Sequence, residues 1–458
     1  MKSTKCYTTN AIKLSDQPGK HNVRKHINAD NLLALIRDDF KKVLDTRADN
    51  VTISLDDALM SALAMFQLKD PSLLAFDRRR REEPGNLHTI YGITNIPCDS
   101  QMRTQLDPVE LPLLRTRFLS VFRQLQRGKD FEKMAYYDGH YLLSADGTGF
   151  YSSQKVSSLY CMSKKKRNGE IIYHQQMFAA TFVHPDSKVV IPVMPEIISN
   201  RDGKKKNDCE RNAAKRFFSE FRREHPHLKV IVVEDALASN GPHIRELQRL
   251  DLRFILGAKP GDHTALFQQL RMAERDGKAR NLACLDSKDQ QKGYYFTFMN
   301  NVPLNDSNQD VLVNVLECLQ VNKDGKATTF SWVTDIPLTE ENVTCIMCAG
   351  RARWKIENET FNTLKNQGYN LGHNYGLGKK NLSAVFTVLT MLAFLIDQAQ
   401  QLGCWLFQAA LQKQKAKKYL WEDIRGFFHH YKVDSMETIL RAIAFGYQRH
   451  DLKNDCIT

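Results

Sequence analysis

The order of strand-like and helix-like segments between residues 141 and 258 is the feature that most limits the fold of this chain. Three segments rich in β-branched and aromatic residues come first, and two helical segments then alternate with two short apolar strands. Strands joined by tight turns pair antiparallel, whereas strands joined through a helix pair parallel. The pattern therefore predicts a mixed α/β sheet, with strands at 141–152, 171–183, 189–198, 230–233 and 253–258 and helices at 208–224 and 243–250.

That order of elements predicts a ribonuclease-H-like α/β layer, with helical regions before and after it. A helix followed by three strand-like runs with turns at Asn305-Asp306-Ser307 and Lys323-Asp324-Gly325 predicts a β-rich insertion. We expect a mobile leader over residues 1 to about 28. The expected units are a helical N-terminal region (1–132), an α/β domain in two parts (133–261 and 345–380), the β-rich insertion (262–344) and a helical C-terminal region (381–458).

The balance of charge and apolar residues limits the compartment and the partners. The formal net charge of +13 and the pI of about 9.1 favour a polyanionic partner, although charge alone leaves membrane surfaces and acidic proteins open. The longest apolar run, residues 384–396, is too short to span a membrane and predicts a buried helix. The N-terminus lacks a signal-peptide core, so we expect a cytoplasmic protein with reduced thiols. The close pair Cys345 and Cys348 is open to a structural metal or to buried free thiols, and the lack of a second pair favours the thiols.

Three acidic residues stand at informative places in the expected layer. Asp146 lies in the first strand, Asp235 follows the apolar fourth strand, and Glu357 lies on a helix after the insertion. Each alone can be explained otherwise, as a turn aspartate, a strand-end cap or half of a surface ion pair. In the expected layer the first and fourth strands are neighbours, so the three carboxylates can converge. Oxygen ligands of this kind hold Mg²⁺, with Mn²⁺ as a substitute, and a pair of such ions assists phosphoryl transfer.

The geometry of the helix expected at 353–365 distinguishes Glu357 from the neighbouring Glu359 as a candidate site residue. Arg353 and Glu357 are four residues apart and share one helix face with Lys365 in reach, whereas Glu359 lies on the other side. Strand alternation likewise directs Glu234 away from the face that Asp235 occupies. We therefore choose Asp235 and Glu357 over their acidic neighbours.

These residues sit in the motifs SADGT, VVED and RWKIEN, which resemble those of the DDE transposases of bacterial insertion sequences, in particular the IS-four superfamily. The resemblance runs from about residue 99 to 395. It implies Asp146, Asp235 and Glu357 as the catalytic, metal-holding acids, with Arg353 and Lys365 binding phosphate. The chain departs from the family's motif at two positions. Gly350 stands where the family has a tyrosine, and Lys365 lies one residue after the position of the family's lysine.

The resemblance also covers the insertion, where that family uses a tryptophan to stack on a base flipped out near the transposon end. Trp332 occupies the matching position, 25 residues before Glu357. Base stacking on an aromatic side chain is worth about 1–3 kcal/mol. Without the resemblance, a core tryptophan explains this residue equally well.

The expected function is metal-dependent DNA cleavage at terminal inverted repeats, followed by strand transfer into target DNA. The expected partners are double-stranded DNA at the transposon ends and at the target, and a second copy of the chain, with no membrane, in the bacterial cytoplasm and on the nucleoid. Two alternatives stay open: a structure-selective nuclease of the same fold, and a DNA-binding regulator derived from a transposase. Candidate DNA-backbone contacts, each positioning phosphate rather than reading bases, are residues 78–81, 164–167, 204–206 and 413–418. A solvated face explains the run 78–81 equally well.

Overall fold

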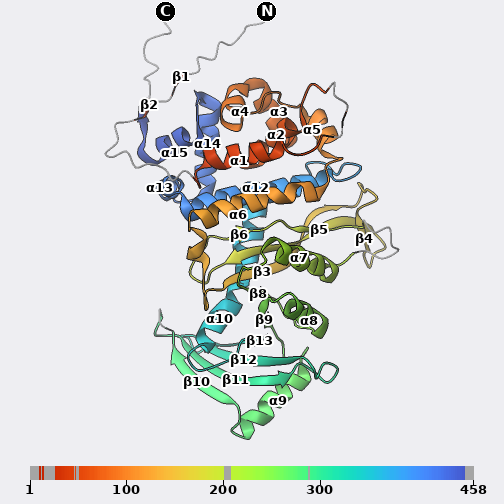
Figure 1. The fold of residues 1–458 in the computed structure, drawn as a ribbon, viewed down its shortest axis with the longest axis vertical. Helices are drawn as coiled ribbons and strands as arrows, with labels where there is room; N and C mark the ends of the chain where they lie inside the picture. The colour runs from red at the N-terminus through yellow and green to blue at the C-terminus, as the bar shows by residue number, and fades with distance from the viewer. Residues whose placement is uncertain are drawn as a thin grey trace, which may run out of the picture.

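The computed structural model describes residues 10–11, 13–14, 26–45, 47, 51–200, 208–286 and 289–448. Most of the expected leader and the basic run 204–206 lie outside the described residues. Along the long axis of the molecule, helices lie at one end, the sheet that carries the acidic residues lies in the middle, and residues 264–334 form the other end (Figure 1).

The central sheet is mixed, which confirms the α/β class. Strand β3 pairs antiparallel with β5 and parallel with β8, and β8 pairs parallel with β9. The third expected strand is divided into two short strands, because Pro192 and Pro195 have no N–H to donate to β5. The strands here are β3 (Tyr141–Ser153), β4 (Met162–Lys165), β5 (Ile171–Val183), β6 (Ile191–Pro192), β7 (Glu196–Ile198), β8 (Val230–Glu234) and β9 (Arg253–Gly257), with helices α7 (Glu210–Glu224) and α8 (Gly241–Arg249).

The segment interpreted as an insertion continues this sheet. Trp332 and Val333 pair with Gly257 and Leu256, so β13 extends the sheet from β9. Strand β10 was not expected, because in residues 280–285 (RNLACL) apolar and polar residues do not alternate. The elements of this segment are α9 (Thr264–Arg275), β10 (Arg280–Leu285), β11 (Gly293–Pro303), β12 (Leu312–Val321) and β13 (Ala327–Thr334).

The helices from the two ends of the chain pack together above the sheet (Figure 1). Helix α12 (Leu382–Gly403) is the centre of this packing and contacts α2, α6 and β6. It is long and apolar enough to cross a membrane by composition, but its most apolar window is wholly buried inside the protein, as expected of a core helix. The other elements are α1 (Ala29–Phe40), α2 (Leu55–Gln67), α3 (Leu73–Glu82), α4 (Pro84–Tyr91), α5 (Asp99–Leu106), α6 (Arg115–Arg127), α13 (Trp405–Gln414), α14 (Lys417–His430), α15 (Met436–Phe445) and the short strands β1 (Asn10–Ala11), β2 (Lys13–Leu14), β14 (Tyr431–Lys432) and β15 (Tyr447–Gln448).

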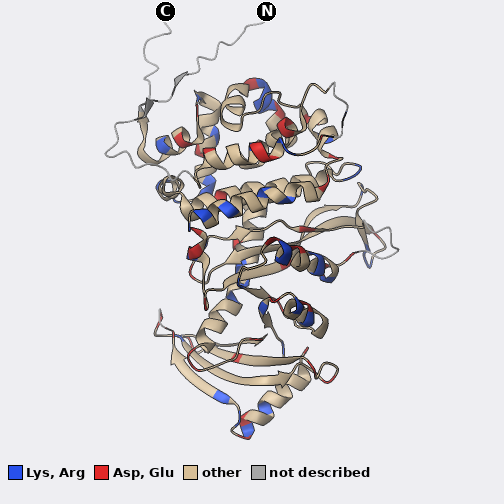
Figure 2. Ribbon diagram, viewed as in Figure 1, with Lys and Arg blue, Asp and Glu red and all other residues tan. Residues whose placement is uncertain are grey.

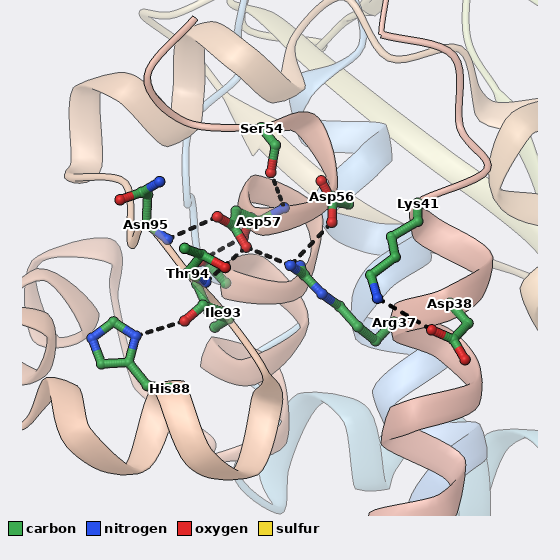
Figure 3. A network of polar contacts seen from close by, with 11 residues as sticks. Arg37, Asp38, Lys41, Ser54, Asp56, Asp57, His88, Ile93, Thr94 and Asn95 are labelled. Atoms are coloured by element: carbon green, nitrogen blue, oxygen red, sulfur yellow. Dashed lines mark hydrogen bonds and ion pairs between the residues drawn. The ribbon is translucent and has the colours of Figure 1, made fainter.

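A buried aspartate fixes the first helices to each other (Figure 3). Ser54 caps α2 by accepting from the Asp57 N–H. The Asp57 carboxylate then accepts from the backbone N–H groups of Thr94 and Asn95 at 3.0 and 2.8 Å, and from Arg37 at 2.7 Å. Because a buried carboxylate needs such partners, this residue ties α1, α2 and the connection after α4 into one unit.

The helix that carries Glu357 differs from the single α-helix expected at 353–365. It begins as α10 (Val343–Ala352), winds as a π-helix over Ile356–Phe361, and ends as α11 (Asn362–Asn366). Insertions of π geometry are uncommon and occur often at functional sites. The i,i+4 pairing of Arg353 with Glu357 survives this change.

Candidate active site

Two aspartates end up level with each other on neighbouring strands. Ser144 of β3 is in register with Val233 of β8, and Asp146 and Asp235 each lie two residues further along their parallel chains. The Asp146 carboxylate accepts from the Gly147 N–H at 2.7 Å, and that of Asp235 accepts from the Leu237 N–H at 2.9 Å. Parallel pairing therefore places both carboxylates at the same edge of the sheet.

The helix of the third acid is anchored to the same face of β3. Ser144 Oγ donates to the Arg353 carbonyl at 3.0 Å, and Lys365 Nζ donates to Thr148 Oγ1 at 2.7 Å. Ser144, Asp146 and Thr148 are every second residue of β3, so their side chains share one face of the strand. The two hydrogen bonds therefore lie on either side of Asp146. The sequence-chosen residues Arg353 and Lys365 are thus both placed beside Asp146.

Arg353 stands between two of the chosen carboxylates. Its Nη1 lies 2.7 Å from Glu357 Oε1 and 3.5 Å from Asp146 Oδ2. The Glu357 side chain is 50% exposed and that of Asp146 is 24% exposed, so both remain accessible from outside. The guanidinium supplies the positive charge that holds Asp146 and Glu357 together.

A cavity of about 660 Å³ opens beside Asp146 between helices α7 and α8. Asp146, Glu210, Glu234, Asp235 and His243 line it, whereas Glu357 does not. Glu234 is the last residue of β8 and alternates with Val233, which is level with Ser144, so its side chain leaves the sheet on the face opposite Ser144. On that face Glu234 Oε2 pairs with His243 Nε2 of α8 at 2.6 Å.

Glu210 lines this cavity but was not singled out from the sequence. It is the first residue of α7, where an acid is ordinarily explained by the helix dipole. A side chain at position 147 would meet Glu210, since a Cβ built there would lie 2.4 Å from Glu210 Oε2. The small residue after Asp146 therefore makes room for this carboxylate, and the sequence signal for it is Gly147 itself.

The carboxylates of this region repel one another. Burial raises the pKa of Asp146 to about 6, with Glu357 and Asp235 adding to the rise while the Gly147 N–H and Arg353 oppose it. Burial also raises the pKa of Glu210 to about 7, and Asp146, Asp235 and Glu234 add to that rise. Raised carboxyl pKa values with like-charged neighbours are typical of functional sites and favour the arrival of a cation.

These shifts predict how stability depends on pH without divalent cations. Both pKa values are higher in the folded chain than the ordinary 3.8 and 4.5, so the folded state binds protons more tightly. Their contribution is present at pH 4 and is lost as the pH rises through 6 and 7. We expect Asp146→Asn with Glu210→Gln to raise the free energy of unfolding at pH 7.5 relative to wild type, with the difference shrinking towards pH 4. Urea unfolding in a chelator measures this, and a difference that is constant with pH would contradict it.

Asp146, Asp235 and Glu357 carry carboxylate oxygens, the donor type that a hard divalent cation prefers. In the side-chain arrangement of the described residues, no three His, Cys, Asp or Glu residues form a group that could hold a metal ion. Between Asp146 and Glu357 the guanidinium of Arg353 is the compensating charge.

The structure does not bring Trp332 to this site as an open stacking surface. The residue is 6% exposed, and its indole packs parallel to Phe330 and against Gly350 of α10. A Cβ at position 350 would lie 2.4 Å from Trp332 Nε1. The presence of Gly350, where the resembled family has a tyrosine, is therefore explained by this packing.

Two other groups singled out in the sequence are the arginine run 78–81 and the pair Cys345 and Cys348. Arg79 is buried against Asp70 at 2.8 Å, and Arg80 pairs with Asp77, so the run 78–81 is largely neutralised within the protein. Cys345 and Cys348 lie on α10 as free, partly buried thiols.

Comparison with known proteins adds no identification: no family model matches the chain, and no curated protein sequence matches it.

Proposed function

We propose that this chain is a metal-dependent DNA transposase of the DDE type, which cleaves DNA at terminal inverted repeats and joins the freed 3′ hydroxyl to target DNA. The observation that carries the proposal is the level placement of Asp146 and Asp235 on parallel neighbours, with the Glu357 helix anchored to the same face of β3. Three acids drawn from separate parts of the chain to one sheet edge are hard to explain by stability, because they repel one another.

The order of the strands supports the finer fold assignment to a ribonuclease-H-like layer. Strands β6 and β7, β5, β3, β8 and β9 follow one another across the sheet, and among these strands only β5 runs antiparallel to β3. In open sheets of this kind, functional side chains gather at the carboxyl ends of the parallel strands. Asp235 follows β8 at that end.

In the proposed reaction, Asp146, Asp235 and Glu357 hold Mg²⁺, or Mn²⁺ in its place. When bound, the cation supplies Lewis-acid polarisation of the scissile phosphate. Arg353 and Lys365 are placed to bind and orient phosphate oxygens beside Asp146, because a guanidinium and an ammonium hold them by charge and hydrogen bonds. Trp332 has no part in this proposal while its ring stays packed.

The surface supplies positive charge for the DNA backbone. Lys and Arg residues lie along α7 and α8 (Figure 2). Arg211 and Lys215 line the cavity. Exposed basic residues also follow the β4 hairpin at 164–167 and the C-terminal helices at Lys413, Lys415 and Lys418. Contacts of this type set affinity and salt dependence rather than base sequence. Synapsis of two DNA ends implies a homodimer, acting in the bacterial cytoplasm.

An assay with labelled DNA tests the function. The substrate is a duplex ending in the inverted repeats found beside the gene, with a supercoiled plasmid as target and Mg²⁺ as cofactor. With Mg²⁺ we expect joined products. In the control with chelator we expect the protein to bind the DNA without cleaving or joining it. Cleavage without joining would support a nuclease instead, and binding without cleavage would support a DNA-binding regulator.

A further inference from the structure

The large sheet ends in two edge strands that differ in how they are protected. Among the described strands, β10 pairs only with β11 at one end, and β4 pairs only with β5 at the other (Figure 1). Edge strands of monomeric proteins usually carry charges, proline or bulges that prevent pairing with another chain. Strand β4 carries Lys164 and Lys165, whereas residues 281–285 (NLACL) of β10 have no charge, no proline and no bulge. Strand β10 is therefore an unprotected edge.

The hydrogen bonds of the β10–β11 hairpin show which backbone groups point outward. The Asp286 N–H donates to the Lys292 carbonyl at 2.8 Å, in the same register as the pairs between β10 and β11. In an antiparallel pair, the N–H and C=O of one residue point to the same side, and successive residues alternate. The even-numbered residues of β10 therefore turn their backbone groups towards β11. The odd-numbered residues turn theirs away from the sheet, and these are Asn281, Ala283 and Leu285.

The charges at the two ends of β10 are complementary about its centre. Arg280 and Asp286 are each three positions from Ala283 and lie on the same face of the strand. Arg280 is exposed, and among the described residues the acid that attracts it, Glu341, lies beyond ion-pair distance. The Asp286 carboxylate is held at the strand end by Tyr294, whose hydroxyl donates to it at 2.6 Å. An antiparallel copy of β10 centred on Ala283 would place an acid opposite a base at both ends.

We propose that β10 is the surface through which two copies of this chain associate, by antiparallel pairing about a two-fold axis at Ala283. Such an interface is self-complementary, because each copy presents the same strand to the other. Ala283 exchanges both backbone hydrogen bonds with the partner's Ala283, and Asn281 does so with the partner's Leu285. The pairing also covers Leu285, which is 65% exposed. This inference goes beyond the proposed function, which implies two copies but does not say where they meet.

Charge reversal in two separate chains tests both the partner and the register. Arg280→Glu places two acids opposite each other at both ends of the pairing, and Asp286→Lys places two bases there. We expect each variant alone to raise the dimer dissociation constant about tenfold or more, measured by sedimentation equilibrium of the full chain. An equal mixture of the two variants has an acid opposite a base at both ends, and we expect it to dimerise like wild type. Arg223→Glu is the control, because Arg223 is an exposed base on α7 and should not affect association.

Hydrogen exchange at single amides of the wild-type chain gives an independent measurement. The outward N–H groups of Asn281, Ala283 and Leu285 should exchange about tenfold or more slowly above the dissociation constant than below it, because only the dimer gives them acceptors. The N–H groups of Leu282 and Cys284 should be protected at both concentrations, because β11 accepts from them. This pattern decides the proposal if Asp286→Lys does not fold.

Three results would overturn the proposal. The first is a wild-type chain that stays monomeric, with exchange at Ala283 independent of concentration. The second is a dimer that Arg280→Glu leaves unchanged, because the copies then meet elsewhere. The third is a mixture of two folded variants that associates no better than either variant alone. None of these measurements involves DNA, so the outcome of the transposase assay is separate.

Discussion

Asp146→Asn is expected to lower the rate of DNA cleavage and joining by about 10³-fold or more, which corresponds to about 4 kcal/mol of lost transition-state stabilisation. Asp146 is the residue that the other groups share. It is level with Asp235, precedes Gly147 in β3, and is 3.5 Å from the Arg353 guanidinium. Asparagine keeps the shape of the side chain but removes the charge, so the loss reports chemistry rather than folding.

The measurement is the single-turnover rate on a labelled DNA end with saturating Mg²⁺. Glu359→Gln is the matched control for the helix, because Glu359 faces Lys355 and Lys417 on the other side of the segment. Glu357→Gln should behave like Asp146→Asn, and Glu359→Gln like wild type. Equal joining by Asp146→Asn and wild type, with unchanged circular dichroism, would mean that these acids are not the active site.

Asp397→Asn is expected to lower the free energy of unfolding by about 3–5 kcal/mol, because it breaks a buried ion pair and leaves one charge uncompensated. Lys69 Nζ lies 2.5 Å from Asp397 Oδ2, and the Lys69 side chain is 0% exposed. The ammonium also lies over the rings of Tyr369 and Trp421, at 4.3 and 4.1 Å. Burial lowers the pKa of Lys69, and Asp397 opposes that shift.

This pair joins distant parts of the chain. Lys69 follows α2, Asp397 lies in α12, and Tyr369, which donates to Asp397 at 2.6 Å, follows the helix that ends with Lys365 and Asn366. Its loss should therefore loosen the end of the segment that carries the third acid. Hydrogen exchange in 362–370 should rise together with the loss of stability.

Urea unfolding measures the effect, and Asp310→Asn is its control. Asp310 pairs with Arg245 on the exposed surface, so its replacement should leave the urea midpoint unchanged. Lys69→Met combined with Asp397→Leu should recover much of the loss, because an apolar pair needs no compensation. A midpoint for Asp397→Asn equal to that of Asp310→Asn would show that the pair contributes nothing measurable.

The amino-acid sequence was sufficient for the parts of the fold that depend on local pattern. Strand β5 occupies the residues expected of it, and β3, β8, β9, α7 and α8 begin or end within a few residues of the expected limits. Alternation and helical periodicity decide such elements, and apolar β8 could only be a central strand. The chosen acids and Arg353 could also be found from pattern, because Asp146 lies within an expected strand, Asp235 follows the end of another, and Arg353 and Glu357 are four residues apart on a helix.

Only the tertiary structure decided which side chains share a space. Glu210 and Gly147 are 63 positions apart, so their contact follows from the packing of α7 on β5, the strand that pairs with β3. The packing of Trp332 into Gly350 and the pairing of Lys69 with Asp397 depend in the same way on elements brought together by folding. Local sequence sets the conformation of a segment, whereas burial and charge compensation arise between segments. The placement of Asp146 beside Asp235 depended on both local sequence and tertiary structure. The sequence pattern assigned each residue to its strand, and the parallel pairing of β3 with β8 placed the two residues level with each other.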